Sequence, residues 1–127
     1  METQRMLKAL DVIYVEIEAE KWVEAKEFYQ EKLGLKIHIG GDEMGWIEYK
    51  VTTSHTTSIA ISRLEKGLKV QSGTGGIPVF LVENIDSVIS ILKEKDVKFI
   101  GSIVEGFVRL IKFEDPCGNV LQLVECH

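Results

Sequence analysis

The same order of predicted secondary structure occurs twice in this chain of 127 residues. Residues 9–17 alternate and are rich in β-branched side chains, which predicts a strand. The segment EAEKWVEAKEFYQEKLGLK that follows carries its apolar residues at helical spacing. Three short strands are predicted next, separated by glycine-rich and hydroxyl-rich turns. The same order starts again at residue 77, which indicates two copies of one βαβββ unit.

The predicted elements define the boundaries of the two copies. Module one comprises residues 9–64, and module two comprises residues 77–125. Between them, EKGLKVQSGTGG (65–76) breaks the periodicity and is predicted to be a linker. The remaining strands are predicted at 35–39, 45–51 and 57–63, then at 77–82, 97–104, 107–113 and 119–125, with a second helix at 85–95. Because each helix would cover one face of its sheet, we expect a single α+β domain whose other sheet faces line something shared.

Composition limits the classes of function. A hydrophobic fraction of 45% is ordinary for a globular chain, the apolar runs are too short to span a membrane, and no signal peptide is recognisable. We therefore expect a cytoplasmic protein with no membrane partner. A net charge of −5 without a basic run disfavours nucleic acid as a partner. Cys117 and Cys126 are expected to stay reduced in that compartment.

The segment FEDPCGNVLQLVE (113–125) is predicted to be a strand, a tight turn and a second strand. Pro116 presets φ for the turn, and Gly118 can adopt the positive φ that the turn needs. In the second strand Gln122 shares a face with two valines, while the neighbouring leucines share the other. An uncharged amide therefore lies in the middle of an otherwise apolar strand face.

Three segments, in this order, resemble the vicinal oxygen chelate superfamily, which includes glyoxalase I, the bleomycin resistance proteins and the extradiol dioxygenases. They are VEAKEFYQEKLGLK, VFLVENIDSVISILKEKDVKF and FEDPCGNVLQLVE. The resemblance implies that two βαβββ modules with curved mixed sheets pair around a shared cavity, and that the assembly is a homodimer. The cavity forms either within one chain or between two chains, because both arrangements follow from the same repeat.

The resemblance also implies four positions for His, Glu or Gln ligands of a divalent metal. By its register these positions fall on Tyr14, Ile77, Gln122 and a residue within 58–62, a stretch without His, Asp, Glu or Gln. Since a metal needs several converging ligands, we expect no metal and no other cofactor. The alternative is a divalent metal with an unusual ligand set that includes Gln122 and Glu16. Histidines 38, 55 and 127 lack the spacing that would aim two of them at one ion.

The same register predicts which side chains line the cavity. They are Tyr14, Glu16, Trp46, Glu48, Ile77, Val79 and Gln122. In the third strand, alternation does not distinguish the pair Trp46 and Glu48 from the pair Ile47 and Tyr49. Tyr14 is alternatively a half-buried strand aromatic, and Glu16 alternatively faces solvent at the cavity mouth. Apolar walls with a few polar groups are typical of a small-molecule pocket.

Three functions remain open from the sequence. A metal-free binding protein for a small cationic or aromatic ligand is the hypothesis we favour, because an acidic cavity attracts a cation. A metal-dependent lyase, isomerase or dioxygenase is the alternative. A metal-free enzyme with Glu16 or Glu48 as general base is the third.

Overall fold

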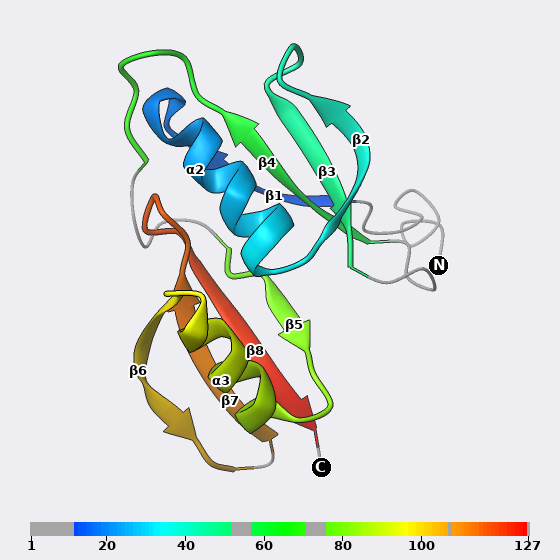
Figure 1. Cartoon of the computed structure of the whole chain (residues 1–127), viewed down its shortest axis with the longest axis vertical. Helices are drawn as coiled ribbons and strands as arrows, with labels where there is room; N and C mark the ends of the chain where they lie inside the picture. The colour runs from blue at the N-terminus through cyan, green and yellow to red at the C-terminus, as the bar shows by residue number, and fades with distance from the viewer. Residues whose placement is uncertain (1–11, 52–56, 71–75, 107, 127) are drawn as a thin grey trace, which may run out of the picture.

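The computed structural model describes residues 12–51, 57–70, 76–106 and 108–126 and confirms the two βαβββ modules (Figure 1). Module one contains β1 (Val12–Ile17), a 3₁₀ turn (Ala19–Lys21), α2 (Trp22–Glu27), a π-helical segment (Phe28–Lys32), β2 (Lys36–Gly41), β3 (Trp46–Lys50) and β4 (Ser58–Arg63). Module two contains β5 (Val79–Leu81), α3 (Ile85–Glu94), β6 (Lys98–Val104), β7 (Val108–Glu114) and β8 (Val120–Cys126). Residues 9–11 of the predicted first strand, 71–75 of the linker, residue 107 and histidines 55 and 127 lie outside the described residues.

Each module forms one four-stranded mixed sheet. The strand orders are β1-β4-β3-β2 and β5-β8-β7-β6. In both sheets the first and last strands of the module pair in parallel, and the other neighbours are antiparallel. The two modules thus share a topology as well as an order of elements.

The first helix differs from the single α-helix that the sequence predicts. A 3₁₀ turn, six residues of α-helix and a π-helical segment follow one another over 19–32. The π segment brings two successive aromatic residues to the core, Phe28 at 3% exposure and Tyr29 at 0%, with their rings edge to face 5.0 Å apart. Helical periodicity alone does not distinguish this wider turn from an α-helix.

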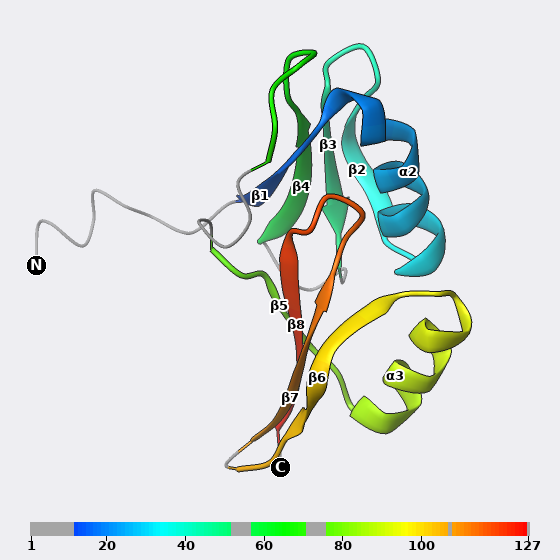
Figure 2. The same cartoon turned by 90° about the vertical axis from the view of Figure 1, so that its left-hand side faces the viewer.

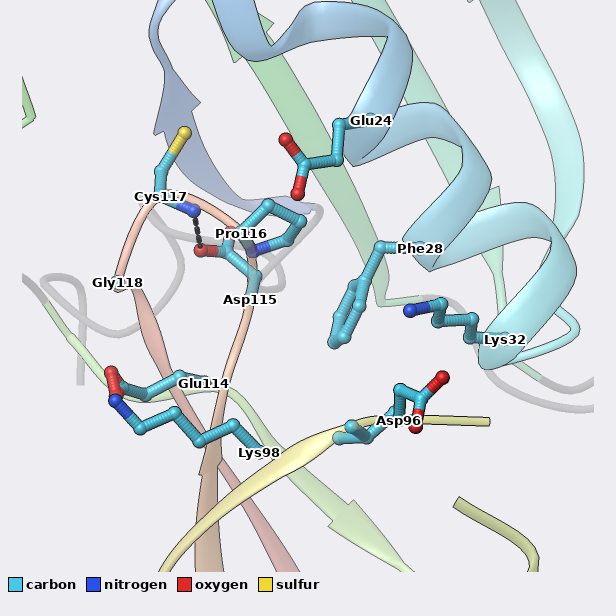
Figure 3. Close-up of a pocket in the computed structure, with 11 residues that line it drawn as sticks. Glu24, Phe28, Lys32, Asp96, Lys98, Glu114, Asp115, Pro116, Cys117 and Gly118 are labelled. Atoms are coloured by element: carbon cyan, nitrogen blue, oxygen red, sulfur yellow. Dashed lines mark hydrogen bonds and ion pairs between the residues drawn. The ribbon is translucent and has the colours of Figure 1, made fainter. Parts of the chain in front are cut away.

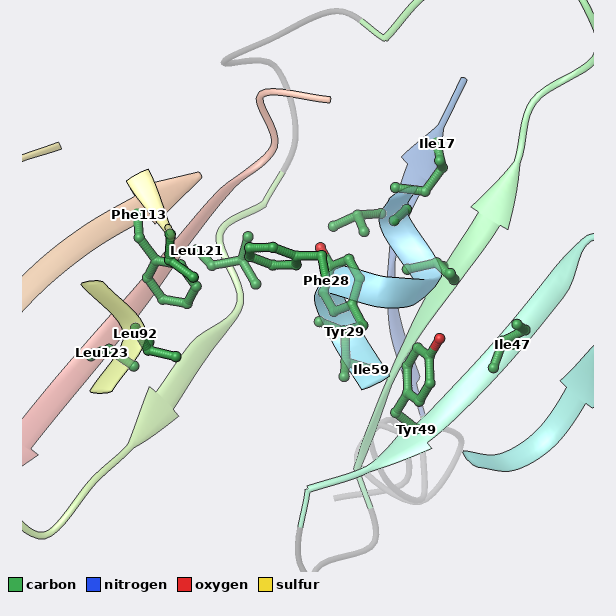
Figure 4. Packing of buried hydrophobic residues seen from close by; sticks show 14 of the residues in the cluster. Ile17, Phe28, Tyr29, Ile47, Tyr49, Ile59, Leu92, Phe113, Leu121 and Leu123 are labelled. Atoms are coloured by element: carbon green, nitrogen blue, oxygen red, sulfur yellow. The ribbon is translucent and has the colours of Figure 1, made fainter. Parts of the chain in front are cut away.

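The helix-covered faces of both sheets form one hydrophobic core (Figure 4). Phe28 of module one packs against Phe113 of module two, with 6.4 Å between ring centroids. The buried β8 leucines 121 and 123 belong to the same cluster, as do Ile47 and Tyr49 from β3. The core is therefore continuous between the modules.

The turn between β7 and β8 binds the helix of module one. Within the turn, Asp115 accepts hydrogen bonds from the backbone N–H of Cys117 and of Asn119, and Gly118 has φ +83°, as its sequence predicts. The Tyr29 hydroxyl donates to Asp115 Oδ2 over 2.9 Å, and Asn119 Nδ2 donates to the Glu16 carbonyl over 2.9 Å. The motif FEDPCGN therefore joins the two modules.

Both helices lie on the same side of the molecule, and the other sheet faces lie on the opposite side (Figure 2). The two sheets do not close around a cavity within the chain. In the described part of the chain no helix has the length and apolar character needed to cross a membrane.

Candidate ligand-binding faces

The uncovered face of the first sheet, here called face one, carries most of the polar and aromatic residues predicted for the cavity. Two rows of paired residues cross it, one through Tyr14, Ala60, Glu48 and Ile39 and the other through Glu16, Ser62, Trp46 and Gly41. Strand β3 turns Trp46 and Glu48 toward face one, whereas Ile47 and Tyr49 are 2% and 0% exposed on the core side. The structure thus shows which pair of β3 residues lies on the uncovered face, which alternation alone leaves open.

An aromatic pair with a carboxylate lies at the centre of face one. The Tyr14 and Trp46 ring centroids are 5.3 Å apart, across the fully buried Ala60. Trp46 Nε1 donates to Glu48 Oε2 over 3.1 Å. Tyr14 is 53% exposed, and Glu16 is exposed at the end of β1. Two rings and two carboxylates are therefore available to a ligand on this face.

The β2–β3 hairpin positions Trp46. Gly40 has φ +101°, and a Cβ at this position would lie 2.0 Å from the Trp46 carbonyl oxygen. The turn is tied to the helix because Asp42 accepts from Trp22 Nε1 and from Lys26 Nζ, each over 2.8 Å. These hydrogen bonds, the one from Lys26 first, lower the pKa of Asp42.

The uncovered face of the second sheet, here called face two, is mostly apolar. The register defines three rows, which are Leu81, Val124, Leu110 and Val104; Val79, Gln122, Lys112 and Ile100; and Val120, Glu114 and Lys98. Gln122 thus lies between Val79 and Lys112, on the face predicted for it. Lys112 is absent from the predicted site residues, although its alternation with Leu110 and Glu114 places the three on one face of β7.

Ile77 lies outside the strand predicted for it. Strand β5 begins at Val79, after Pro78, whose carbonyl accepts from the Gln122 backbone N–H over 2.9 Å. Proline has no N–H to donate to a sheet, which is consistent with this late start. Ile77 is 40% exposed just before the strand.

The predicted site residues form two groups on separate sheets. Tyr14, Glu16, Trp46 and Glu48 lie together on face one, and Val79 and Gln122 lie together on face two. Both faces point to the same side of one chain (Figure 2). A single chain therefore does not bring the two groups to one ligand.

One pocket lies between α2 and the β7–β8 turn and borders face two at Lys98 and Glu114 (Figure 3). It has a volume of about 430 Å³ and is lined by Glu24, Phe28 and Lys32 on one side and by residues 114–118 on the other. The Lys98–Glu114 ion pair, with 3.5 Å between its charged atoms, lies at its edge. Burial raises the pKa of the Cys117 thiol in this pocket to about 11, so the thiol is protonated and poorly nucleophilic at neutral pH.

A second pocket, of about 350 Å³, lies where module one approaches β5. Its walls are mainly apolar and include Ile13, Val51, Ile59, Val79 and Leu81. Neither of these two pockets is lined by residues of both predicted groups.

A sequence model of the Glyoxalase/Bleomycin resistance protein/Dioxygenase superfamily matches residues 16–123. The chain belongs to this superfamily. The match includes both modules, in agreement with the resemblance drawn from the three sequence segments.

Solved structures share the superfamily fold. A putative glyoxalase family protein from Bacillus anthracis has 21% identity and a TM-score of 0.75, over 95% of this chain and 97% of that one. A superfamily member from Sphaerobacter thermophilus has 24% identity and a TM-score of 0.75, over 94% and 98%. TnmS3, an antibiotic binding protein from a Streptomyces species, has 20% identity and a TM-score of 0.72, over 95% and 98%. No curated protein sequence matches the chain.

The residues present do not fit the divalent metal that the superfamily resemblance implies. Tyr14 pairs with Ala60 on face one, and Gln122 pairs with Val79 on face two, so each sheet offers at most one feasible donor at these positions. No group of three His, Cys, Asp or Glu side chains able to hold a metal occurs within the described ranges.

Proposed function

We propose that this superfamily member binds a small planar cation without a metal or other cofactor. The observation that carries the proposal is the pairing of Tyr14 and Trp46 beside Glu16 and Glu48 on face one. Aromatic faces attract cations through their quadrupole, and Trp provides the strongest such interaction. The carboxylates add a longer-range attraction that salt weakens.

The proposed cavity requires a second copy of the chain. In one chain both faces point to the same side and do not meet (Figure 2). Face two leaves Leu81 70% exposed, Val104 58% and Val79 54%, which is unusual for a monomer because contiguous apolar patches favour association. We infer a homodimer in which face one of each copy covers face two of the other, so that the ligand is enclosed between them. The antibiotic-binding role of TnmS3 is a precedent for binding on this fold.

The test is a titration with proflavine, a planar monocation, monitored by tryptophan fluorescence. Trp22 is 4% exposed, so Trp46 is the tryptophan that a ligand on face one quenches. We expect saturable binding that weakens roughly tenfold in Trp46→Leu and several-fold in Glu48→Gln. Glu94→Gln, which removes an exposed carboxylate at the end of α3, serves as the matched control and is expected to bind as the wild type does.

The absence of saturable binding by proflavine and other planar cations, in a folded dimer, would overturn the proposal. Binding that Trp46→Leu leaves unchanged would place the site elsewhere. Metal analysis of untagged protein tests the metal-free part separately. Stoichiometric metal, or a rise of several degrees in Tm with Ni²⁺, Zn²⁺, Mn²⁺ or Fe²⁺ that Gln122→Ala abolishes, would contradict it.

A further inference from the structure

Face two contains one lysine that forms no ion pair within the described residues. Lys112 lies in the middle row of the sheet, with Gln122 as its register partner on β8 and Ile100 on β6. Its neighbour along the strand, Glu114, is paired with Lys98 over 3.5 Å. Lys112 is exposed, and Gln122 is half-buried beside it. The lysine and the glutamine are thus the two polar residues of this row, on neighbouring strands of a mostly apolar face.

The surroundings of this pair favour binding of an anion. The row on one side is entirely apolar, consisting of Leu81, Val124, Leu110 and Val104, and the Lys98–Glu114 pair on the other side is neutral overall. A lysine donates up to three hydrogen bonds and accepts none, and the glutamine side chain donates two through its nitrogen and accepts through its oxygen, so the lysine sets the preference for an anion. When an apolar face is covered, the attraction between opposite charges increases because water no longer screens it.

We propose that Lys112 and Gln122 bind an oxyanion, such as a carboxylate, on an aromatic ligand. The proposal deepens the proposed function and in part rests on it. In the dimer, face one of one copy would contact the cationic end of the ligand, and face two of the other copy would contact its anionic end. The ligand class is then a planar zwitterion rather than a simple cation. The same contact explains why an uncharged amide lies in the middle of β8.

The experiment uses 2-naphthoate, a planar carboxylate, as the probe in calorimetric titrations. We expect Lys112→Met to weaken its binding roughly fivefold to tenfold and to reduce its salt dependence, whereas Lys112→Arg retains binding. Gln122→Leu removes the amide donors and is expected to weaken binding severalfold. Lys98→Met is the matched control, because it removes a lysine from the same face that already has a partner, and it should leave the affinity unchanged.

Proflavine, titrated into the same variants, separates this inference from the proposed function. If proflavine binding depends on Trp46 but naphthoate binding is unchanged in Lys112→Met, the inference is overturned and the proposed function stands. Naphthoate binding that depends on Lys112, without any proflavine binding, would support the inference and overturn the planar-cation function. If Lys112→Met loses the dimer and binds neither probe, Lys112 pairs with a carboxylate of the second copy. That result would also overturn the inference.

Discussion

Asp115 is the only charged side chain that is buried in the described part of the chain, at 5% exposure. Its carboxylate accepts four hydrogen bonds, from the Tyr29 hydroxyl, the Asn119 side chain and the backbone N–H groups of Cys117 and Asn119. Burial raises the pKa of this carboxyl, and the hydrogen bonds oppose the rise. The pKa of the Asp115 carboxyl therefore lies above its ordinary value, because burial outweighs the four hydrogen bonds.

The stability of the protein should depend on pH through Asp115. The pKa of Asp115 is higher in the folded protein than in the unfolded chain. The stability that protonated Asp115 contributes is therefore fully present below the unfolded pKa and is lost as the pH rises through the folded pKa. Each tenfold difference in proton affinity corresponds to about 1.4 kcal/mol. We expect the free energy of unfolding of the wild type, minus that of Asp115→Asn, to fall with rising pH. The measurement is urea unfolding of both proteins between about pH 3.5 and 8.

The comparison with Asp115→Asn removes the contributions of the other carboxylates, which both proteins share. A difference that grows with pH would show that the four hydrogen bonds outweigh burial and lower the pKa of Asp115.

Among the elements, the β2–β3 hairpin depends most on a single backbone conformation. The strand register shifts between Ile37 and Ile39, and Gly40 follows with a positive φ directly beneath the Trp46 carbonyl. The next residue, Gly41, has no positive φ and has open space around a hypothetical Cβ. Two adjacent glycines in one strand therefore have different roles.

Alanine substitutions distinguish these two glycines. Gly40→Ala is expected to cost about 2–4 kcal/mol, because its Cβ meets backbone that must shift and its φ is unfavourable for alanine. It should also change the Trp46 emission spectrum, because the shift moves β3. Gly41→Ala serves as the control and is expected to change stability by less than about 0.5 kcal/mol. Equal effects of the two substitutions in thermal unfolding would contradict the role assigned to Gly40.

At the scale of the whole molecule, the orientation of the sheets is the decisive feature. The β7–β8 turn holds module two against the helix of module one, and both uncovered faces therefore point to the same side (Figure 2). Because the two faces of one chain are held pointing the same way, a ligand is enclosed between a face one and a face two when a second chain supplies one of them.

Leu81→Glu is expected to convert the proposed dimer into a monomer, because it places a charge in the apolar row of face two. Sedimentation velocity should give the wild type twice the chain mass of 14.3 kDa, and Leu81→Glu one chain mass. Val23→Glu is the control, since Val23 on α2 is 73% exposed and Leu81 is 70% exposed. A monomeric wild type would contradict the proposed assembly, and an unaffected Leu81→Glu dimer would place the interface elsewhere.

Several parts of the site were predictable from sequence, and others were not. The strand alternation of β8 places Gln122 correctly on the face away from the buried leucines. For β3, alternation is equally consistent with either face, and burial of Ile47 and Tyr49 under the helix decides it. In the sequence Lys112 is an ordinary surface lysine, and only the strand register shows that Gln122 lies beside it. The π-helical segment has no spacing of apolar residues that distinguishes it from an α-helix.

The sequence by itself determined the order of elements, the two-fold repeat and the superfamily, because periodicity, turn residues and segment order are local properties of the chain. Only the tertiary structure decided that the two groups of site residues lie on separate, uncovered faces that point to the same side. That outcome depends on long-range contacts between the modules, such as the hydrogen bond between Tyr29 and Asp115, which joins residues 86 positions apart. No local pattern contains such a contact, because it arises only when both modules have folded and packed together.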